Sequence, residues 1–111
     1  MKLSKIDIFG TKYTIKYVDK ITKDLISDPD LQKEDSFWFG LTNGPEKEIY
    51  IATKGMKGSP LTEEEIYNTL LHEVIHAIFG EGAYSSANND EPLVEWTAKC
   101  LRSLTKQGLF K

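Results

Sequence analysis

The sequence HEVIH at residues 72–76 contains the only two histidines of the 111-residue chain. On a helix, residues four apart lie on one face, so the two imidazoles can reach the same metal ion. Zinc held by two histidines takes a third protein ligand and keeps an open position for a water, whose pKa it lowers. The spacing therefore predicts a Zn²⁺ site at His72 and His76, with Glu73 as the general base.

The residues around this motif predict the helix that the geometry requires. Thr62 and Glu65 have the spacing of a capping box, and residues 63–65 bring three glutamates to the positive end of the helix dipole. One broad arc is apolar and consists of Ile66, Tyr67, Leu70, Leu71, Val74, Ile75 and Ile78. We therefore expect a helix from residue 63 to residue 79, ended by Gly80. Thr69, His72, Glu73 and His76 should lie on the arc that faces away from the core.

The third ligand must be a carboxylate, because no other histidine exists and Cys100 falls on the apolar arc of a later helix. Four acids near the motif are candidates: Glu81, Asp90, Glu91 and Glu95. Glu95 has Lys99 and Arg102 further along its own face, so an ordinary surface ion pair explains it. Glu91 has no such cation. We therefore favour Glu91 as the metal ligand and Glu95 as a group that hydrogen-bonds a ligand histidine.

Four segments before the motif have the pattern of strands. Residues 4–9 and 12–18 alternate apolar and polar side chains around a turn, and residues 36–42 and 47–53 flank a second turn. Residues 20–35 carry five acids that a solvated loop explains, with apolar residues spaced for one or two helical turns before Pro29. Glycines and a proline predict a loop over residues 54–61.

A last helix is expected over residues 91–106, after an eleven-residue loop over 80–90. Pro92 fixes its start, because proline is tolerated only in the first turn. The whole chain, 1–111, is then a single α+β domain in which a small, mostly antiparallel sheet packs with a central helix and a C-terminal helix.

Charge and composition exclude several classes of partner. The net charge is −3, from 14 basic and 17 acidic residues, which argues against binding to nucleic acid or to an anionic membrane. No apolar stretch is long enough to span a bilayer, and the start lacks the apolar run of a signal peptide. The single cysteine, Cys100, cannot form an intramolecular disulfide, so we expect a cytoplasmic protein.

The order of strands, then TLLHEVIHAIF, a loop and NDEPLVEWTAKCLRSL resembles the small zincin domains of phages and mobile elements. It is similar to the minimal core of ImmA/IrrE-type metallopeptidases, within the gluzincin-type group whose third ligand is a glutamate. The resemblance covers residues 36–106, and Glu91, Ala98 and Leu101 match the spacing of that group. It implies that His72, His76 and Glu91 bind zinc and that Glu73 is the base.

The expected function is that of a zinc-dependent peptidase. A peptide substrate would add to the sheet along an edge strand at residues 47–53 and bind through main-chain hydrogen bonds. Tyr84 in the long loop is a candidate donor to the oxyanion, although a plain loop tyrosine explains it better. Two alternatives are a non-catalytic binding or regulatory module stabilised by zinc, and a zinc hydrolase that acts on a non-peptide amide.

Overall fold

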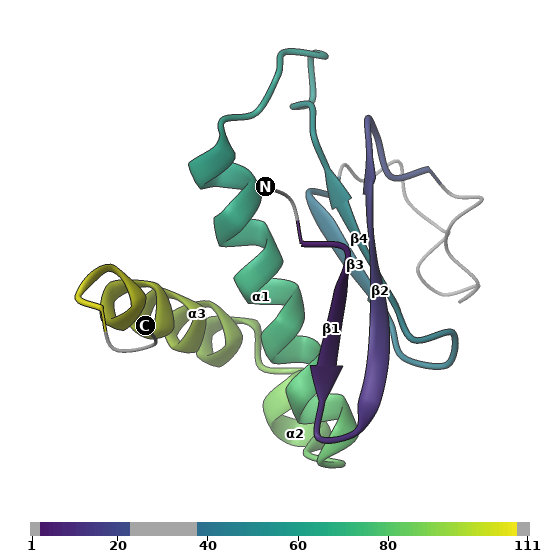
Figure 1. The fold of residues 1–111 in the computed structure, drawn as a ribbon, viewed down its shortest axis with the longest axis vertical. Coiled ribbons are helices and arrows are strands. Elements are labelled where there is room, and N and C mark those ends of the chain that lie inside the picture. Colours follow the sequence, from purple (N-terminus) through teal and green to yellow (C-terminus); the bar gives the residue numbers. More distant parts are fainter. Residues whose placement is uncertain (1–2, 23–37, 109–111) are drawn as a thin grey trace.

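The computed structural model describes residues 3–22 and 38–108, which form a sheet flanked by helices (Figure 1). The elements are β1 (Lys5–Ile8), β2 (Thr11–Val18), β3 (Gly40–Asn43), β4 (Glu48–Ala52), α1 (Glu63–Glu81), α2 (Ser85–Asn88) and α3 (Glu91–Lys106). This arrangement confirms the expected α+β class. Nearly all of the acidic segment expected over residues 20–35 lies outside the described residues.

The four strands form one mixed sheet in the order β1-β2-β4-β3. β1 pairs with β2 and β3 pairs with β4 in antiparallel hairpins, as the turn residues between them predict. β2 and β4 pair in parallel, with Ile15 opposite Ile49. The sheet is thus mostly antiparallel, and one parallel contact joins its two hairpins.

The expectation that residues 47–53 form an edge strand is wrong. β4 has β2 on one side and β3 on the other, so among the strands of the described residues β3 is the edge strand at this end of the sheet. The physical reason is that both faces of β4 are apolar and covered. Ile49 and Ile51 are fully buried on one face, while Tyr50 and Ala52 are buried on the other.

α1 packs on one face of the sheet and forms the main core with it. The buried members of this core are Ile8, Tyr13, Ile15, Ile49, Ile51, Leu70 and Ala77. The other face carries a smaller cluster in which Trp38 and Leu41 pack against buried Ile21, Tyr50 and Ala52. Both faces of the sheet are thereby covered, which fixes the position of α1 against it.

α3 packs against α1, which lies between α3 and the sheet (Figure 1). Buried Ile75 of α1 meets buried Val94 and Ala98 of α3. This contact brings the first turn of α3 to the part of α1 that carries the histidines.

Several expected boundaries differ from the structure. The strand expected over residues 36–42 is β3, which begins only at Gly40 and ends at Asn43. α1 continues through Gly80 to Glu81 and is capped by Gly82, because Gly80 keeps a helical conformation. The loop expected over residues 80–90 contains the single turn of α2, whose N-cap is Tyr84. The start of α1 is as predicted, since Thr62 and Glu65 form both hydrogen bonds of the capping box.

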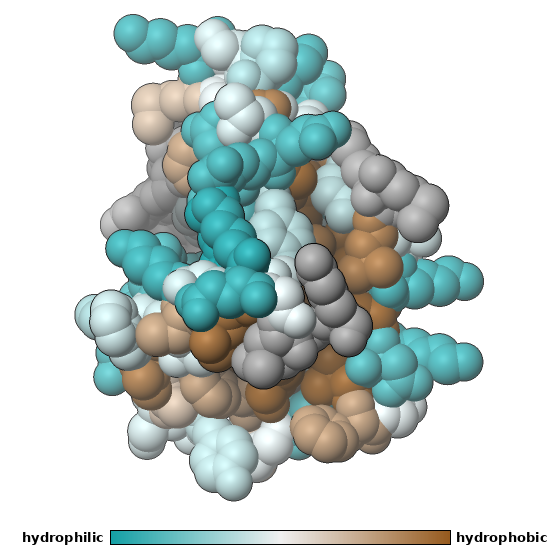
Figure 2. Space-filling view, turned by 60° about the vertical axis from the view of Figure 1, so that its left-hand side comes forward, coloured by the Kyte–Doolittle hydropathy of each residue, from teal (hydrophilic) through white to brown (hydrophobic). Residues whose placement is uncertain are grey.

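Hydrophobic side chains reach the surface in several places, and Figure 2 shows them mostly in the lower half of one face, beside hydrophilic ones. The most exposed large ones belong to four separate segments and are Phe9, Met56, Tyr84 and Trp96. No helix within residues 3–22 and 38–108 has the length and apolar character needed to cross a membrane.

Candidate metal centre

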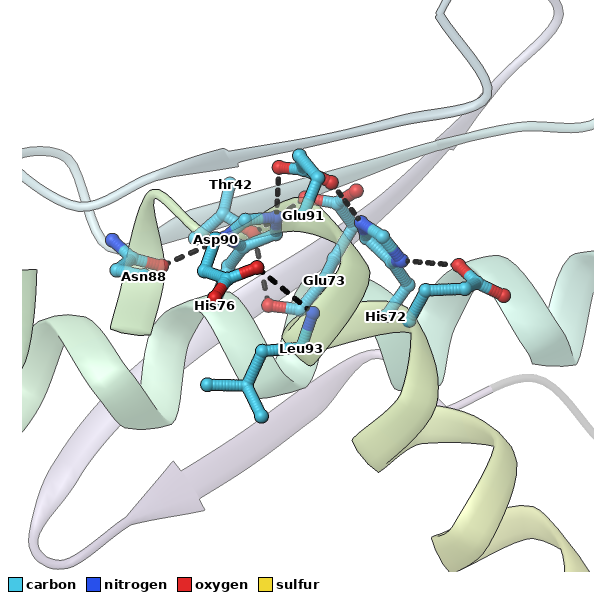
Figure 3. Close-up of polar contacts among 9 residues, drawn as sticks. Thr42, His72, Glu73, His76, Asn88, Asp90, Glu91 and Leu93 are labelled. Atoms are coloured by element: carbon cyan, nitrogen blue, oxygen red, sulfur yellow. Dashed lines mark hydrogen bonds and ion pairs between the residues drawn. The ribbon is translucent and has the colours of Figure 1, made fainter. Parts of the chain in front are cut away.

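His72, His76 and Glu91 meet at one point between α1 and α3 (Figure 3). His72 Nε2 lies 3.0 Å from Glu91 Oε2, and His76 Nε2 lies 3.0 Å from Glu91 Oε1. The histidines are one turn apart on α1, and the first residue of α3 supplies the carboxylate. The structure therefore brings together the three residues that the sequence suggests as ligands.

A second oxygen orients each imidazole from its other side. His72 Nδ1 lies 2.8 Å from Glu95 Oε2, and His76 Nδ1 lies 2.7 Å from Asn88 Oδ1. Carboxylate and amide oxygens accept hydrogen bonds, so each Nδ1 carries the proton that it donates. In the neutral form of the ring, each Nε2 then presents its lone pair towards Glu91. The sequence did not identify Asn88, since only the turn of α2 brings it beneath His76.

This arrangement of lone pairs has an electrostatic consequence. Two neutral Nε2 atoms and two carboxylate oxygens face one another at 3.0 Å, and their lone pairs repel unless a proton or a cation lies between them. Zinc–ligand bonds of about 2.0–2.1 Å at tetrahedral angles put neighbouring ligand atoms roughly 3.3 Å apart. The donor types and their spacing therefore fit Zn²⁺.

Glu73 lies beside this point but is buried, with 7% of its surface exposed. We expected it on an arc that faces away from the core, and this is wrong because β3 covers that part of α1. The Thr42 hydroxyl lies 2.7 Å from Glu73 Oε1. Burial raises the pKa of the Glu73 carboxyl. The hydrogen bond from Thr42 opposes this rise most strongly, and the nearby His76 and His72 oppose it less.

The metal centre opens into a cleft of about 890 Å³ between β3 and the helices. Its lining includes the four site residues His72, Glu73, His76 and Glu91. Trp38, Phe39, Lys47 and Glu81 also line it. The cleft is large enough for several residues of a peptide, with the candidate base and ligands exposed to it.

The other two candidate carboxylates have different roles. Glu81 Oε2 accepts hydrogen bonds from Lys47 Nζ at 2.8 Å and from the Tyr13 hydroxyl at 2.5 Å. These contacts lower the pKa of Glu81 to about 2, and the contact with Lys47 has a larger effect than that with Tyr13. Asp90 caps α3 by accepting a hydrogen bond from the Leu93 amide at 3.1 Å.

The surface pairing expected for Glu95 is wrong. Arg102 Nη2 lies 2.5 Å from Glu64 Oε1 on α1, and within the described part of the chain no ion pair joins Glu95 to Lys99. Because α1 crosses α3, Glu64 of α1 is the acid that pairs with Arg102. The carboxylate of Glu95 contacts His72 instead. The argument that Glu95 pairs with a cation of its own helix while Glu91 has none therefore does not hold. It does not distinguish the two carboxylates.

Tyr84 does not take part in the centre. Two-thirds of its surface is exposed at the start of α2, and it does not line the cleft. The simpler reading of a loop tyrosine fits this position.

No protein-family model, curated protein or solved structure matches this chain. The similarity to zincin-type peptidases thus rests on the sequence pattern of residues 36–106 alone and stays a prediction.

Proposed function

We propose that this protein is a zinc-dependent peptidase whose metal ligands are His72, His76 and Glu91 and whose general base is Glu73. One observation carries the proposal. In both imidazoles Nδ1 contacts an oxygen acceptor of the protein, while Nε2 faces the carboxylate of Glu91. The buried carboxyl group of Glu73 lies next to them and lines the open cleft.

Zn²⁺ held by these residues would supply a Lewis acid that polarises a carbonyl and acidifies a water. The other parts of the reaction belong to the chain. Glu73 takes the proton from the attacking water and delivers it to the departing amine. Its burial supports this role, because a carboxyl group with a raised pKa holds a proton more readily between the two transfers.

The shape of the cleft favours a peptide over a small amide. Its volume of about 890 Å³ lies at the upper end of the usual range for small-molecule sites, and Trp38, Phe39 and Leu41 are among the residues that line it. β3 is an edge strand, and such a strand can pair with an extended chain through main-chain hydrogen bonds. We propose that the peptide lies along β3 rather than along residues 47–53.

A second candidate function is a non-catalytic module that uses zinc for stability. It is favoured by the number of elements that meet at the centre, since Asn88 of α2 and Glu91 and Glu95 of α3 all contact histidines of α1. A metal ion there would cross-link α1 and α3, and the contact of Asn88 with His76 would hold α2 beside them. With either function, the lone Cys100 fits a reducing cytoplasm, which we propose as the location.

Metal analysis combined with digestion of an unfolded protein tests the proposal. The purified chain should hold about one zinc ion after dialysis without chelator, because three protein ligands and a water complete the site. Zinc-loaded wild type should cleave reduced, carboxymethylated α-lactalbumin, whereas Glu73→Gln should keep its zinc and lose at least about 100-fold in rate.

His76→Ala should lose the zinc and the activity together, and this distinguishes a ligand from a base. A folded wild-type protein that binds no zinc would contradict the metal centre itself. Zinc binding without cleavage of this protein or of a random peptide library would favour the non-catalytic module.

A further inference from the structure

Thr42 of β3 is the residue that holds the carboxyl group of Glu73. Its hydroxyl lies 2.7 Å from Glu73 Oε1 and 2.9 Å from the backbone oxygen of the same residue (Figure 3). Only 7% of the Glu73 surface is exposed, so these contacts are shielded from most competing water. Thr42 thus connects the edge strand to the side chain that we propose as the base.

Gly40 precedes Thr42 by two residues on the same face of β3, and it lies directly against Glu73. A Cβ atom at Gly40 would come within 2.7 Å of Glu73 Cγ and within 2.9 Å of Glu73 Oε2. It would also come within 2.7 Å of Thr69 Cγ2. Real Cβ atoms do not approach other atoms so closely, so only glycine lets β3 lie this near to α1.

The two oxygens of Glu73 therefore have different surroundings. Oε1 contacts the Thr42 hydroxyl, whereas Oε2 accepts no hydrogen bond from any residue in the described ranges 3–22 and 38–108. Oε2 lies against the space that Gly40 leaves open, and Glu73 lines the cleft.

We propose that β3 assigns separate roles to these oxygens: Thr42 is a positioning residue that fixes Oε1, and Oε2 is the atom that exchanges the proton. This rests on the proposed peptidase function, in which Glu73 is the base. A glutamate side chain has three rotatable bonds, and without an anchor its carboxyl group would sample several orientations. A base held in one orientation begins each turnover in the productive geometry.

Three variants test this role. Thr42→Val removes the hydroxyl and keeps the shape of the side chain, whereas Thr42→Ser restores the hydroxyl. Thr105→Val is the matched control, because Thr105 also donates to a backbone oxygen, that of Leu101 at 2.8 Å, but does not line the cleft. Each variant is loaded with zinc, and kcat and KM are measured on reduced, carboxymethylated α-lactalbumin. Zinc affinity is measured by competition with a chelator.

We expect Thr42→Val to lower kcat by about 10- to 100-fold, which is part of the 10²–10⁴ that a general base contributes. KM should stay within about twofold, because the peptide would pair with main-chain atoms of β3 that the substitution leaves in place. Zinc affinity should also stay within about twofold, since Thr42 is not one of the proposed metal ligands. Thr42→Ser should recover most of kcat, and Thr105→Val should equal wild type. A normal kcat for Thr42→Val, a failure of serine to rescue, or an equal loss of zinc affinity would overturn the proposal.

Crystal structures of the zinc-loaded variants give a readout that does not depend on turnover. Glu73 should have one orientation in wild type and Thr42→Ser, with Oε1 on the hydroxyl, and more than one in Thr42→Val. An unchanged Glu73 in Thr42→Val would overturn the positioning role. A wild type that orders Glu73 in this way but cleaves nothing would instead contradict the peptidase function.

Discussion

Glu91 and Glu95 lie one turn apart on α3, yet they contact opposite nitrogen atoms of His72. Glu91 faces Nε2 at 3.0 Å and Glu95 faces Nδ1 at 2.8 Å. In the neutral tautomer that donates from Nδ1, the first contact joins two atoms that each have a lone pair, whereas the second is an ordinary hydrogen bond. The two carboxylates are chemically equal but have different partners, and their substitution should have different effects.

Glu91→Ala should weaken zinc binding far more than Glu95→Ala. The first variant removes one of three proposed ligands, while the second removes an orienting partner, a loss that typically costs about 10- to 100-fold in affinity. Competition with a chelator at pH 7 measures both constants. A collapse of affinity in Glu95→Ala beside an unchanged Glu91→Ala would reverse the two roles.

At the scale of elements, Glu81 connects the end of α1 to the sheet. Its carboxylate accepts hydrogen bonds from Tyr13 on β2 and from Lys47, which precedes β4. Lys47 also lies 5.6 Å from the centre of the Tyr13 ring and has a φ of 55°, which is uncommon for a residue with a side chain. All three residues of this cluster line the cleft, and their contacts hold α1 against the strands.

The Glu81 cluster should make stability depend on acid. The pKa of Glu81 is about 2 in the folded chain and about 4.3 when unfolded, so its contribution is complete above pH 4.3 and is lost as the pH falls towards 2. In zinc-free protein, Glu81→Gln should therefore lower Tm at pH 6, and the difference from wild type should shrink by pH 3.

The control for this measurement is Glu46→Gln, which changes an acid in the turn between β3 and β4 whose side chain makes no ion pair within the described residues. It should give the same Tm as wild type at both values of pH. A Tm difference for Glu81→Gln that stays constant from pH 6 to pH 3 would show that the carboxylate charge contributes nothing.

At the scale of the whole molecule, the proposed centre lies where the helices meet rather than within one element. Among the helices within residues 3–22 and 38–108, α1 is the one that packs directly on the main core of the sheet, and it carries both histidines. α2 and α3 reach the sheet mainly through α1, and their residues Asn88, Glu91 and Glu95 all approach those histidines. Metal binding should therefore stabilise the packing of α2 and α3 against α1.

Zinc should raise the Tm of wild type and leave that of His76→Ala unchanged. A ligand that binds only the folded chain stabilises it by about 2.7 kcal/mol when its free concentration is 100 times Kd, which in a domain of this size corresponds to roughly 10 °C. Differential scanning calorimetry with and without chelator measures the shift. An equal Tm in both conditions would contradict a zinc site formed by the native fold.

Short-range features of this protein follow from its sequence. The capping box of Thr62 and Glu65, the helical spacing of His72 and His76, and Pro92 in the first turn of α3 each depend on residues within a few positions. Both hairpins were also predictable, because alternating side chains and turn residues specify them locally.

Only the tertiary structure decided which distant segments meet. The parallel pairing of β2 with β4 made β3 the edge strand, and this brought Gly40 and Thr42 onto Glu73 and buried it. Because α1 and α3 cross, Arg102 forms an ion pair with Glu64. The turn of α2 brings Asn88 into contact with His76. These contacts depend on how whole apolar faces pack, which no local spacing of residues encodes.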